Sequence, residues 1–423
     1  MREKPQAVLV LGLREQEHEI EFVQALGYSI LLFGTNIRID DALSADVPVE
    51  IDLNDEDHVI ATALTLTQRF DIRGVYTLNE YRTPLAARIA AALKLSHGLS
   101  HEAALNCRHK KRTRQVLAQH AVGSARFALI NTHQEALAAL RDFSFPVIIK
   151  PSNEAGSHLV ACCTTQQEVL QAIDAIQASS TNWVGQSLDP EILLEEYLDG
   201  PEVSVEAYTA AGHTTVLAIT AKQVTPWPFT TEVGHLVPAN LPDTTTAAIH
   251  EVVVRALSAL GINDTVTHTE VKLTSAGPRI IEVNARPGGD KIPLLVRAVT
   301  GYDLREVSLH LALGRAASDL PRYPIAASSA AIRFLVAEQN GTVEIGDPEE
   351  IAMLPGVQAV EISVQTGDQV EQTSSNYNRV GYVLVHGTPQ QSASERLVQV
   401  LDRLAFHVES PDISIDDPVK TRS

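Results

Sequence analysis

The sequence of 423 residues contains only three cysteines, Cys107, Cys162 and Cys163. They form no CxxC pair and lack the spacing of metal ligands, and adjacent cysteines rarely form a disulfide, so a reducing compartment is expected. Long apolar runs are also scarce. The first one ends after about seven residues at Arg14, which is too short for a signal sequence or a membrane span. We therefore expect a cytoplasmic protein with no membrane partner.

Positive charge is scarce as well. The chain carries 33 Lys and Arg against 52 Asp and Glu, which gives a formal charge of −19. A nucleic-acid-binding surface is not expected, although a local cationic site can still bind phosphates. No internal repeat is present, which excludes a solenoid. The length predicts two or three packed units rather than one core.

Strand and helix patterns alternate in the first hundred residues. Strands are predicted at residues 7–13, 29–33 and 72–76. Residues 16–26 carry apolar side chains at helical spacing, and an alanine-rich helix is predicted at residues 84–93. This alternation predicts a parallel sheet covered by helices on both faces.

The pattern changes after about residue 105. Thr132 and Thr165 each stand three residues before a glutamate and an apolar helical pattern, so two capping boxes predict two helices. A Pro-, Thr- and Gly-rich connection at residues 223–243 is longer than ordinary loops and is typical of a lid or binding loop. The other predicted elements are strands at 147–150, 192–197, 203–208, 266–273 and 278–284, and helices at 245–260 and 393–404.

The most informative stretch contains Glu270, Glu282 and Asn284. Side chains two apart on a strand leave the same face, so Glu282 and Asn284 are expected to point together. A turn at residues 277–278 predicts Glu270 on the neighbouring antiparallel strand. Two carboxylates and an amide oxygen suit Mg²⁺ when phosphates supply the remaining ligands. The whole cluster favours a metal site over a solvated strand face.

Arg286 follows this cluster at the same spacing, where it could hold an anionic oxygen with two hydrogen bonds. The glycines at 288 and 289 then allow backbone amides to approach a ligand.

A second segment begins at Lys150, which ends a predicted strand and precedes a loop of small residues that includes Ser152, Gly156 and Ser157. The ammonium group and the loop amides can hold phosphates, and Gly156 gives the loop freedom to close over a nucleotide. Because the lysine precedes the loop, this is not a P-loop. Taken alone, an ordinary lysine at a strand end explains the segment equally well.

A third segment passes from an apolar strand into a loop at residues 193–202. Its backbone could meet an adenine edge, and Glu202 could accept hydrogen bonds from ribose hydroxyls. A surface hairpin with solvated glutamates is the alternative for this segment alone.

In this order, the three segments resemble the ATP-grasp superfamily across nearly the whole chain. Residues 108–117 look like the family's "DK…R..L" segment, with His109 where aspartate is usual. The resemblance implies ATP with Mg²⁺, or possible Mn²⁺, as cofactors. It implies that phosphates meet Lys110, Lys150, Ser152, Gly156 and Ser157. The adenine and ribose residues are implied to be Glu195, Glu196, Tyr197, Leu198 and Glu202, and the metal ligands Glu270, Glu282 and Asn284.

Within the superfamily, the chain most resembles the L-amino-acid ligases, which make dipeptides. The matching stretches are residues 231–238, 268–270 and 286–290. The resemblance implies that Glu232 and His235 line the amino-acid pocket and that either could be the base for the incoming amine. It implies that Arg286, with the backbone of Gly289, holds the carboxylate and the tetrahedral intermediate. Residues that could also reach the substrate are Glu80 and Asp290, while His268 is expected to be structural.

The implied fold class is mixed α/β and α+β. Its expected parts are a Rossmann-like domain at 1–105, a small ATP-grasp lobe with a linker at 106–200, a large lobe with the metal and substrate site at 201–319, and a β-rich subdomain at 320–423. No chemistry is predicted for the last part, and the final dozen residues are expected to form a loose tail.

The implied reaction is ATP-dependent formation of a peptide bond between L-amino acids through an acyl phosphate, with release of ADP and phosphate. The expected partners are small-molecule amino acids and a possible second copy in a homodimer. One alternative is another ATP-grasp enzyme, such as a carboxylase subunit or a purine-pathway ligase, which would lack the Glu232 and His235 pattern. The other is a non-catalytic ATP-binding regulator, which would have no chemical reason to keep Glu270, Glu282 and Arg286 together.

Overall fold

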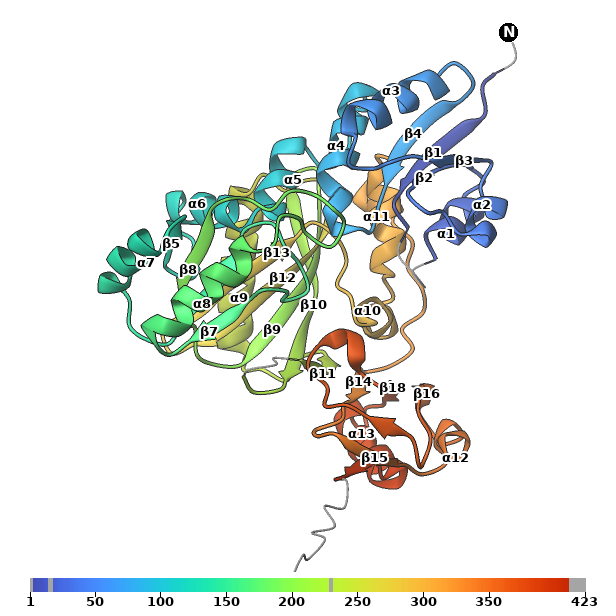
Figure 1. Ribbon diagram of the computed structural model, residues 1–423. Coiled ribbons are helices and arrows are strands. Elements are labelled where there is room, and N and C mark those ends of the chain that lie inside the picture. The colour runs from blue at the N-terminus through green and yellow to red at the C-terminus, as the bar shows by residue number, and fades with distance from the viewer. Residues whose placement is uncertain (1–2, 14–17, 228–230, 411–423) are drawn as a thin grey trace, which may run out of the picture. The chain divides into compact units, whose positions relative to one another are not determined.

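The computed structural model describes residues 3–13, 18–227 and 231–410. The predicted C-terminal tail and the start of the predicted helix at 16–26 lie outside these residues. The chain forms two compact units, one from Met1–Lys222 with Val237–Ala326 and one from Gln223–Leu236 with Ala327–Ser423 (Figure 1). The finer division into four parts stays a prediction.

The first sheet of the larger unit is parallel, with the order β3-β2-β1-β4. Its strands are β1 (Gln6–Leu11), β2 (Ser29–Gly34), β3 (Val47–Glu50) and β4 (Asp71–Tyr76). The helices of this region are α1 (Glu19–Ala25), α2 (Ile39–Ser44), α3 (Glu56–Leu66), the 3₁₀ helix η1 (Glu80–Arg82) and α4 (Thr83–Ala92).

Helices cover both faces of this sheet, which confirms the prediction from the alternating pattern. Leu9 and Leu31 point to the side where Val59 of α3 and Ile89 of α4 pack. Their neighbours in the strands face the opposite side, which is covered by α1 and by α11 (Leu304–Ala312). The alternation of strand side chains thus produces two apolar layers.

A second, antiparallel sheet has the order β5-β8-β6-β7. Its strands are β5 (Phe127–Ile130), β6 (Val147–Pro151), β7 (Ala161–Cys163) and β8 (Ile192–Glu196). The helices before and within this region are α5 (His101–Arg108), α6 (Lys110–Gln119), α7 (His133–Ala139), the 3₁₀ helix η2 (Leu140–Asp142) and α8 (Gln166–Gln177).

The predicted N-caps of α7 and α8 are confirmed. The hydroxyls of Thr132 and Thr165 each accept a hydrogen bond from the backbone of the glutamate three residues later, at 3.2 Å. The reciprocal half of each capping box differs from the expected form. The glutamate carboxylates accept hydrogen bonds from the backbone of Asn131 and Thr164, one residue before each cap. At each helix start, the threonine side chain thus binds the glutamate backbone, and the glutamate side chain binds the backbone before the cap.

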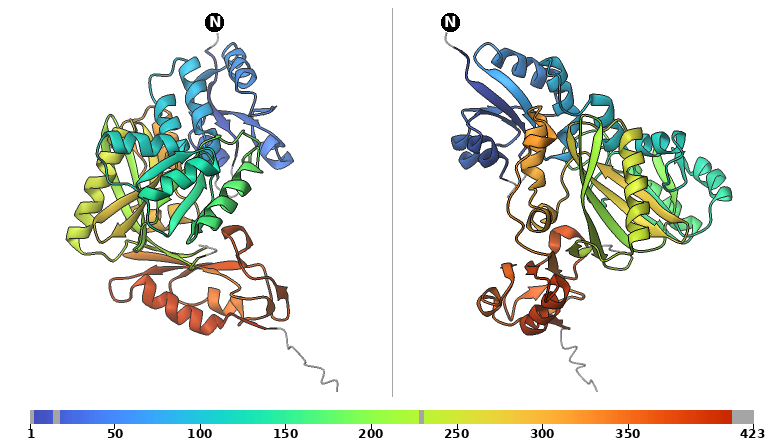
Figure 2. Two further views of the ribbon diagram at one scale, coloured as in Figure 1. Left: turned by 60° about the vertical axis from the view of Figure 1, so that its left-hand side comes forward. Right: turned by 180° about the vertical axis from the view of Figure 1, so that it is seen from behind.

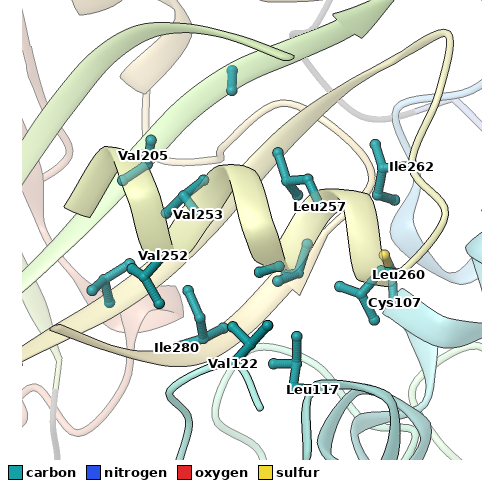
Figure 3. Packing of buried hydrophobic residues seen from close by; sticks show 14 of the residues in the cluster. Cys107, Leu117, Val122, Val205, Val252, Val253, Leu257, Leu260, Ile262 and Ile280 are labelled. Atoms are coloured by element: carbon teal, nitrogen blue, oxygen red, sulfur yellow. The ribbon is translucent and has the colours of Figure 1, made fainter. Parts of the chain in front are cut away.

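A third group of strands in the larger unit has the order β13-β12-β9-β10. These strands are β9 (Glu202–Ala210), β10 (His213–Val224), β12 (Thr265–Thr274) and β13 (Gly277–Asn284). Helix α9 (Asp243–Ala259) packs on one face, where Val253 and Leu257 meet Val205 and Ile280 in a buried apolar cluster (Figure 3). The elements that follow β13 are α10 (Ile292–Thr300), α11 and the 3₁₀ helix η3 (Ala317–Asp319).

The smaller unit is built on strands in the order β11-β14-β18-β16. Helix α13 (Ala393–Leu404), whose predicted bounds are confirmed, packs on β14 and β18 (Figure 2). The main strands are β11 (Glu232–Val237), β14 (Ser329–Leu335), β16 (Val357–Ile362) and β18 (Gly381–Gly387). The remaining elements are β15 (Gly341–Glu344), α12 (Pro348–Ala352), β17 (Gln369–Val370), the 3₁₀ helix η4 (Asn376–Asn378) and β19 (His407–Glu409).

The prediction of one uninterrupted connection at residues 223–243 is wrong in part. Strand β10 continues to Val224, and Glu232–Val237 forms β11. A Cβ atom on Gly234 would lie 2.9 Å from the carbonyl oxygen of Ile332 in β14, so glycine here permits close strand pairing. Glycine is typical of loops, but here the close pairing of β11 with β14 requires it, so composition alone predicts a loop where a strand forms. Among the described residues, none of the helices has the length and apolar character needed to span a bilayer.

Candidate functional site

Two carboxylates face each other across the hairpin of β12 and β13. Glu270 is the partner of Glu282 in the strand register, and His268 is the partner of Asn284. Residues directly opposite in an antiparallel pair project from the same face, and Asn284 shares that face with Glu282 two residues before it. The predicted antiparallel arrangement of these three residues is confirmed.

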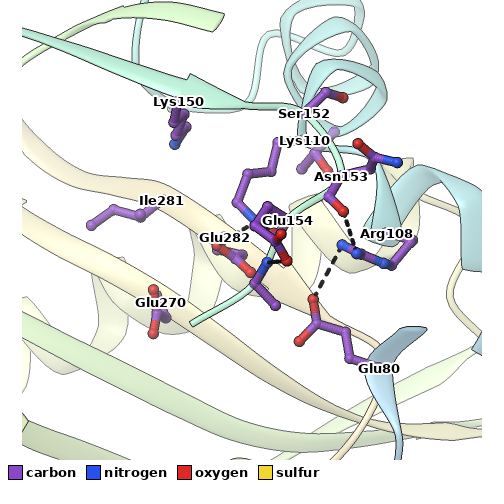
Figure 4. Close-up of polar contacts among 12 residues, drawn as sticks. Glu80, Arg108, Lys110, Lys150, Ser152, Asn153, Glu154, Glu270, Ile281 and Glu282 are labelled. Atoms are coloured by element: carbon purple, nitrogen blue, oxygen red, sulfur yellow. Dashed lines mark hydrogen bonds and ion pairs between the residues drawn. The ribbon is translucent and has the colours of Figure 1, made fainter. Parts of the chain in front are cut away.

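Lysines approach both carboxylates. The Lys110 ammonium lies 3.2 Å from Glu282 and donates a 2.7 Å hydrogen bond to the Glu154 carbonyl oxygen (Figure 4). The Lys222 ammonium lies 2.6 Å from Glu270 and 2.7 Å from Glu202. Burial alone would raise the pKa of Glu270, but Lys222 and His268 hold it well below its usual range. Both carboxylates are therefore held close to cationic groups.

Lys222 was not identified from the sequence. Its side chain is only 2% exposed, at a position in β10 beside Glu202 of β9 and Glu270 of β12. The available signal was a lysine inside a strand pattern, since buried lysines occur almost only with a charged partner. The partners could not be named without the strand order.

Lys150 and Arg114 share one buried carboxylate. The Lys150 ammonium lies 2.8 Å from one oxygen of Glu195, and Nε of Arg114 lies 2.8 Å from the other. Burial would raise the pKa of Glu195, but Arg114 and Lys150 lower it. The Glu195 side chain thus fixes Lys150, so an adenine contact at this residue would use the backbone.

The strand β8 leads into the remaining residues of the third segment. The carboxylate of Glu196 accepts a hydrogen bond from the Arg126 backbone at 2.8 Å, so its side chain points to β5 and not to the residues around Lys150. Tyr197 and Leu198 follow β8 and are half-buried. Beyond them, Glu202 binds Lys222 and also lies 3.3 Å from Lys272.

The loop after Lys150 is anchored at its start. The Ser152 carbonyl oxygen accepts a 2.8 Å hydrogen bond from the Lys110 backbone. The Glu154 carboxylate accepts hydrogen bonds from the Tyr81 hydroxyl and from the Ala155 backbone. The two following positions, Gly156 and Ser157, have φ values of 64° and 58°. The loop therefore begins rigidly and then turns through the left-handed region.

Glu80 reaches the same cluster from the end of the parallel sheet. Its carboxylate accepts a 2.5 Å hydrogen bond from Arg286. It also lies 3.6 Å from Arg108 (Figure 4). Burial would raise the pKa of Glu80, but Arg286 and Arg108 lower it to about 2. The carboxylates of Glu80, Glu282 and Glu270 in turn raise the pKa of Arg286 against the effect of burial. Arg286 is thus surrounded by negative charge and stays cationic.

The His268 ring packs against the backbone of Gly288, the first of the two glycines after Arg286. It lies 2.9 Å from Glu206 and 3.6 Å from Glu270. Burial would lower its pKa, but Glu206 raises the pKa of His268 to about 10. A Cβ atom on Gly288 would lie 2.8 Å from the His268 ring, so the backbone here needs glycine. Gly289 accepts a hydrogen bond from Ile292 at the start of α10, and Asp290 adopts a φ of 53°.

Glu232 and His235 belong to the smaller unit. Both lie on β11, where Nε2 of His235 is 4.0 Å from the Glu232 carboxylate. The His235 side chain is buried, and its ring meets the Phe334 ring edge-on with 5.9 Å between the centroids.

Two family models match this chain in separate segments. Residues 143–293 match the ATP-grasp domain, and residues 333–409 match the L-amino acid ligase C-terminal domain 2. The chain belongs to the ATP-grasp superfamily.

Relatives of this ATP-grasp protein include ligases and synthases of small molecules. Dapdiamide A synthase of Enterobacter agglomerans is 26% identical over 385 residues, which cover 87% of this chain and 88% of that protein. Alanine–anticapsin ligase of Bacillus subtilis is 26% identical over 282 residues, which cover 63% and 59%. The crystal structure of L-amino acid ligase from Bacillus licheniformis has a TM-score of 0.76 and 25% identity, and covers 97% of this chain and 100% of that one.

This protein is therefore an ATP-grasp ligase related to L-amino acid ligases. Its residues fit the nucleotide and metal that such enzymes generally use. Lys110 and Lys150 carry positive charge of the kind that binds phosphates, and the oxygens of Glu270, Glu282 and Asn284 are hard donors of the kind that suit Mg²⁺.

Proposed function

We propose that this protein joins two L-amino acids in a peptide bond at the expense of ATP, releasing ADP and phosphate. The observation that carries this proposal is the cross-strand pair of Glu270 and Glu282, with Lys110 beside Glu282 and Arg286 beyond the same strand. The names of the relatives support it, because two of them are ligases of alanine or of L-amino acids and the third is a synthase of a small molecule.

In the first step, an oxygen of the substrate carboxylate attacks the γ-phosphorus of ATP, and the bond to ADP breaks. The proposed product is an acyl phosphate. Lys110 and Lys150 would balance the phosphate charge, and Glu270, Glu282 and Asn284 would hold Mg²⁺. When bound, the metal neutralises the charge that develops on the transferred phosphoryl group.

In the second step, the amine of the other amino acid attacks the acyl carbon, and phosphate leaves. Arg286 and the Gly289 backbone would stabilise the oxyanion that forms at this carbon. Glu80 fixes the Arg286 guanidinium through the 2.5 Å hydrogen bond and so limits its freedom before the reaction.

The attacking amine must first lose a proton. We assign this step to Glu232 or His235, which lie 4.0 Å apart on β11. Asp290, in a strained left-handed conformation after the glycine pair, would line the pocket for a side chain of the substrate. A carboxylate at this place favours a polar or basic amino acid.

The test is phosphate release from MgATP with all twenty L-amino acids, singly and in pairs, followed by mass spectrometry of the products. We expect phosphate and ADP that depend on a particular pair, with the mass of the dipeptide. Phosphate release with a carboxylate other than an amino acid would point to different ATP-grasp chemistry. Bound ATP without turnover on any pair would contradict the proposed reaction.

A further inference from the structure

A braced turn lies before β18 in the smaller unit. Its first residue, Thr373, is buried and exchanges two 2.9 Å hydrogen bonds with Ala337. The Asn378 side chain accepts hydrogen bonds from the backbone of Ser374 and Ser375, which closes the turn around η4. Asn376 lies between Ser375 and Asn378, so these hydrogen bonds hold its backbone in place.

The Asn376 side chain binds Glu232 at two points. Its Oδ1 accepts a 2.8 Å hydrogen bond from the Glu232 backbone N–H, and its Nδ2 donates a 3.2 Å hydrogen bond to the Glu232 carboxylate. The two residues are 144 positions apart in the sequence. Because the backbone donor determines which end of the amide faces it, the NH₂ group must face the carboxylate.

Arg379 joins the same contact from the end of the turn. Its Nε donates a 2.8 Å hydrogen bond to the Asn376 carbonyl oxygen, and Nη1 donates one of 3.2 Å to the Glu232 carbonyl oxygen. Its guanidinium lies 3.7 Å from the centroid of the Phe334 ring, which also meets His235 edge-on. Asn376 and Arg379 thus determine the placement of Glu232, while Phe334 connects Arg379 to His235.

We propose that Asn376 and Arg379 are positioning residues for the amino-acid pocket, and that they aim the Glu232 carboxylate at the ammonium group of a substrate amino acid. This inference rests on the proposed function. A carboxylate has about four lone-pair sites, so one oxygen can accept from Asn376 while the group also accepts from an ammonium. A glutamate that is already ordered loses less conformational entropy when the substrate binds. The role gives the C-terminal region, for which the sequence predicts no chemistry, a part in substrate recognition.

The experiment compares Asn376→Ala with Asn340→Ala. Asn340 is a matched control in the same unit, because its Oδ1 also accepts a backbone hydrogen bond, from Gln372 at 2.7 Å. Losing a hydrogen bond to a charged group predicts about a tenfold rise in KM for one of the two amino acids in Asn376→Ala, with the KM for ATP unchanged. Equal KM values for both amino acids in the two variants, or a parallel rise in KM for ATP, would overturn the proposal.

A second variant keeps the backbone contact and alters only the carboxylate contact. Asn376→Asp retains the acceptor for the Glu232 N–H but has no Nδ2 donor for the Glu232 carboxylate, so the KM for the same amino acid should again differ from that of the wild type. A KM equal to that of the wild type would contradict the assigned role.

Calorimetric titration with single amino acids separates this inference from the proposed reaction. If the wild-type protein makes no dipeptide but binds an amino acid, weaker binding by Asn376→Ala supports the positioning role while the ligase reaction fails. If the wild-type protein binds no amino acid, the positioning role fails as well.

Discussion

The guanidinium of Arg286 donates a 2.5 Å hydrogen bond to the carboxylate of Glu80, a residue 206 positions earlier in the chain. Through this contact, the 3₁₀ helix after the parallel sheet holds the arginine that follows β13. Arg108 also lies 3.6 Å from this carboxylate, so one carboxylate serves two guanidinium groups, of which that of Arg108 is buried. Its loss would leave both without this partner.

The Glu80→Gln variant should be less stable at neutral pH, by about 3 kcal/mol, because a buried ion pair loses one member. The pKa of Glu80 is lowered to about 2 in the folded protein, from 4.5 in the unfolded chain. Its contribution is therefore complete above pH 4.5 and is lost as the pH falls toward 2. Denaturant unfolding at several pH values should show the two proteins converging in acid.

The control for this prediction is Glu251→Gln on α9, whose side chain is 74% exposed beside Arg255. It should change stability by less than about 0.5 kcal/mol at any pH. A constant difference between the wild type and Glu80→Gln from pH 7 to pH 3 would show that Glu80 does not titrate as described.

Replacement of Glu282 by Gln should weaken binding of a divalent cation and lower kcat/KM by about 100-fold, since the metal contributes several kcal/mol to phosphoryl transfer. Electron paramagnetic resonance of Mn²⁺ in the presence of ADP measures the binding separately from turnover. Removal of divalent cations by a chelator should stop ADP release by the wild type, and added Mg²⁺ should restore it. Unchanged Mn²⁺ affinity in Glu282→Gln would remove this residue from the proposed ligands.

The Glu195→Gln variant should lose about 3 kcal/mol of stability, because Lys150 and Arg114 lie buried against this carboxylate. The KM for ATP should also rise by about tenfold as Lys150 loses its fixed position. The adjacent residue gives the control, since Glu196→Gln changes a half-exposed side chain that binds Arg126. Similar melting temperatures and similar KM values for the two variants would contradict the assigned difference.

The turn before β9 approaches β12 closely at Gly200, and substitution of this glycine can be compared with that of Gly212, which follows β9. A Cβ atom on Gly200, where φ is 123°, would lie 2.2 Å from the Leu273 carbonyl oxygen, whereas one on Gly212, where φ is 77°, meets no atom within 4 Å. Gly212→Ala should cost about 1 kcal/mol, from backbone strain alone. Gly200→Ala should cost about 3 kcal/mol or more, because the backbone of β12 must move. Urea unfolding measures both losses of stability, provided that the dependence of the unfolding free energy on urea concentration is the same in the variants. Equal unfolding midpoints for Gly200→Ala and Gly212→Ala would contradict the prediction.

The sequence predicted those parts of the site that depend on neighbours along the chain. The hairpin that pairs Glu270 with Glu282 follows from a turn signal and from the two-residue period of strands. The caps at Thr132 and Thr165 follow from hydrogen bonds that close over three residues. Both are local rules, so a single sequence is sufficient to apply them.

Contacts between distant segments could not be predicted in the same way. Strand β9 lies between β10 and β12 in the sheet, and the Lys222 side chain on β10 contacts Glu270 on β12. This strand order is not encoded in any short sequence pattern. The sequence of β11 predicts part of a loop, because Gly234 and polar neighbours are typical of loops. The pairing of β11 with β14 depends instead on residues nearly a hundred positions later. These features come from packing between segments, which periodicity does not report.

The smaller unit consists of two stretches, Gln223–Leu236 and Ala327–Ser423, and the contact of Asn376 with Glu232 joins them. It follows that this unit cannot be exchanged between related enzymes by replacing one continuous segment of the chain. A chimera with a cut only at residue 327 would pair a foreign turn with the native β11 and mismatch the residues around Glu232. Recombination that aims to alter substrate choice must therefore transplant the short internal stretch together with the C-terminal one.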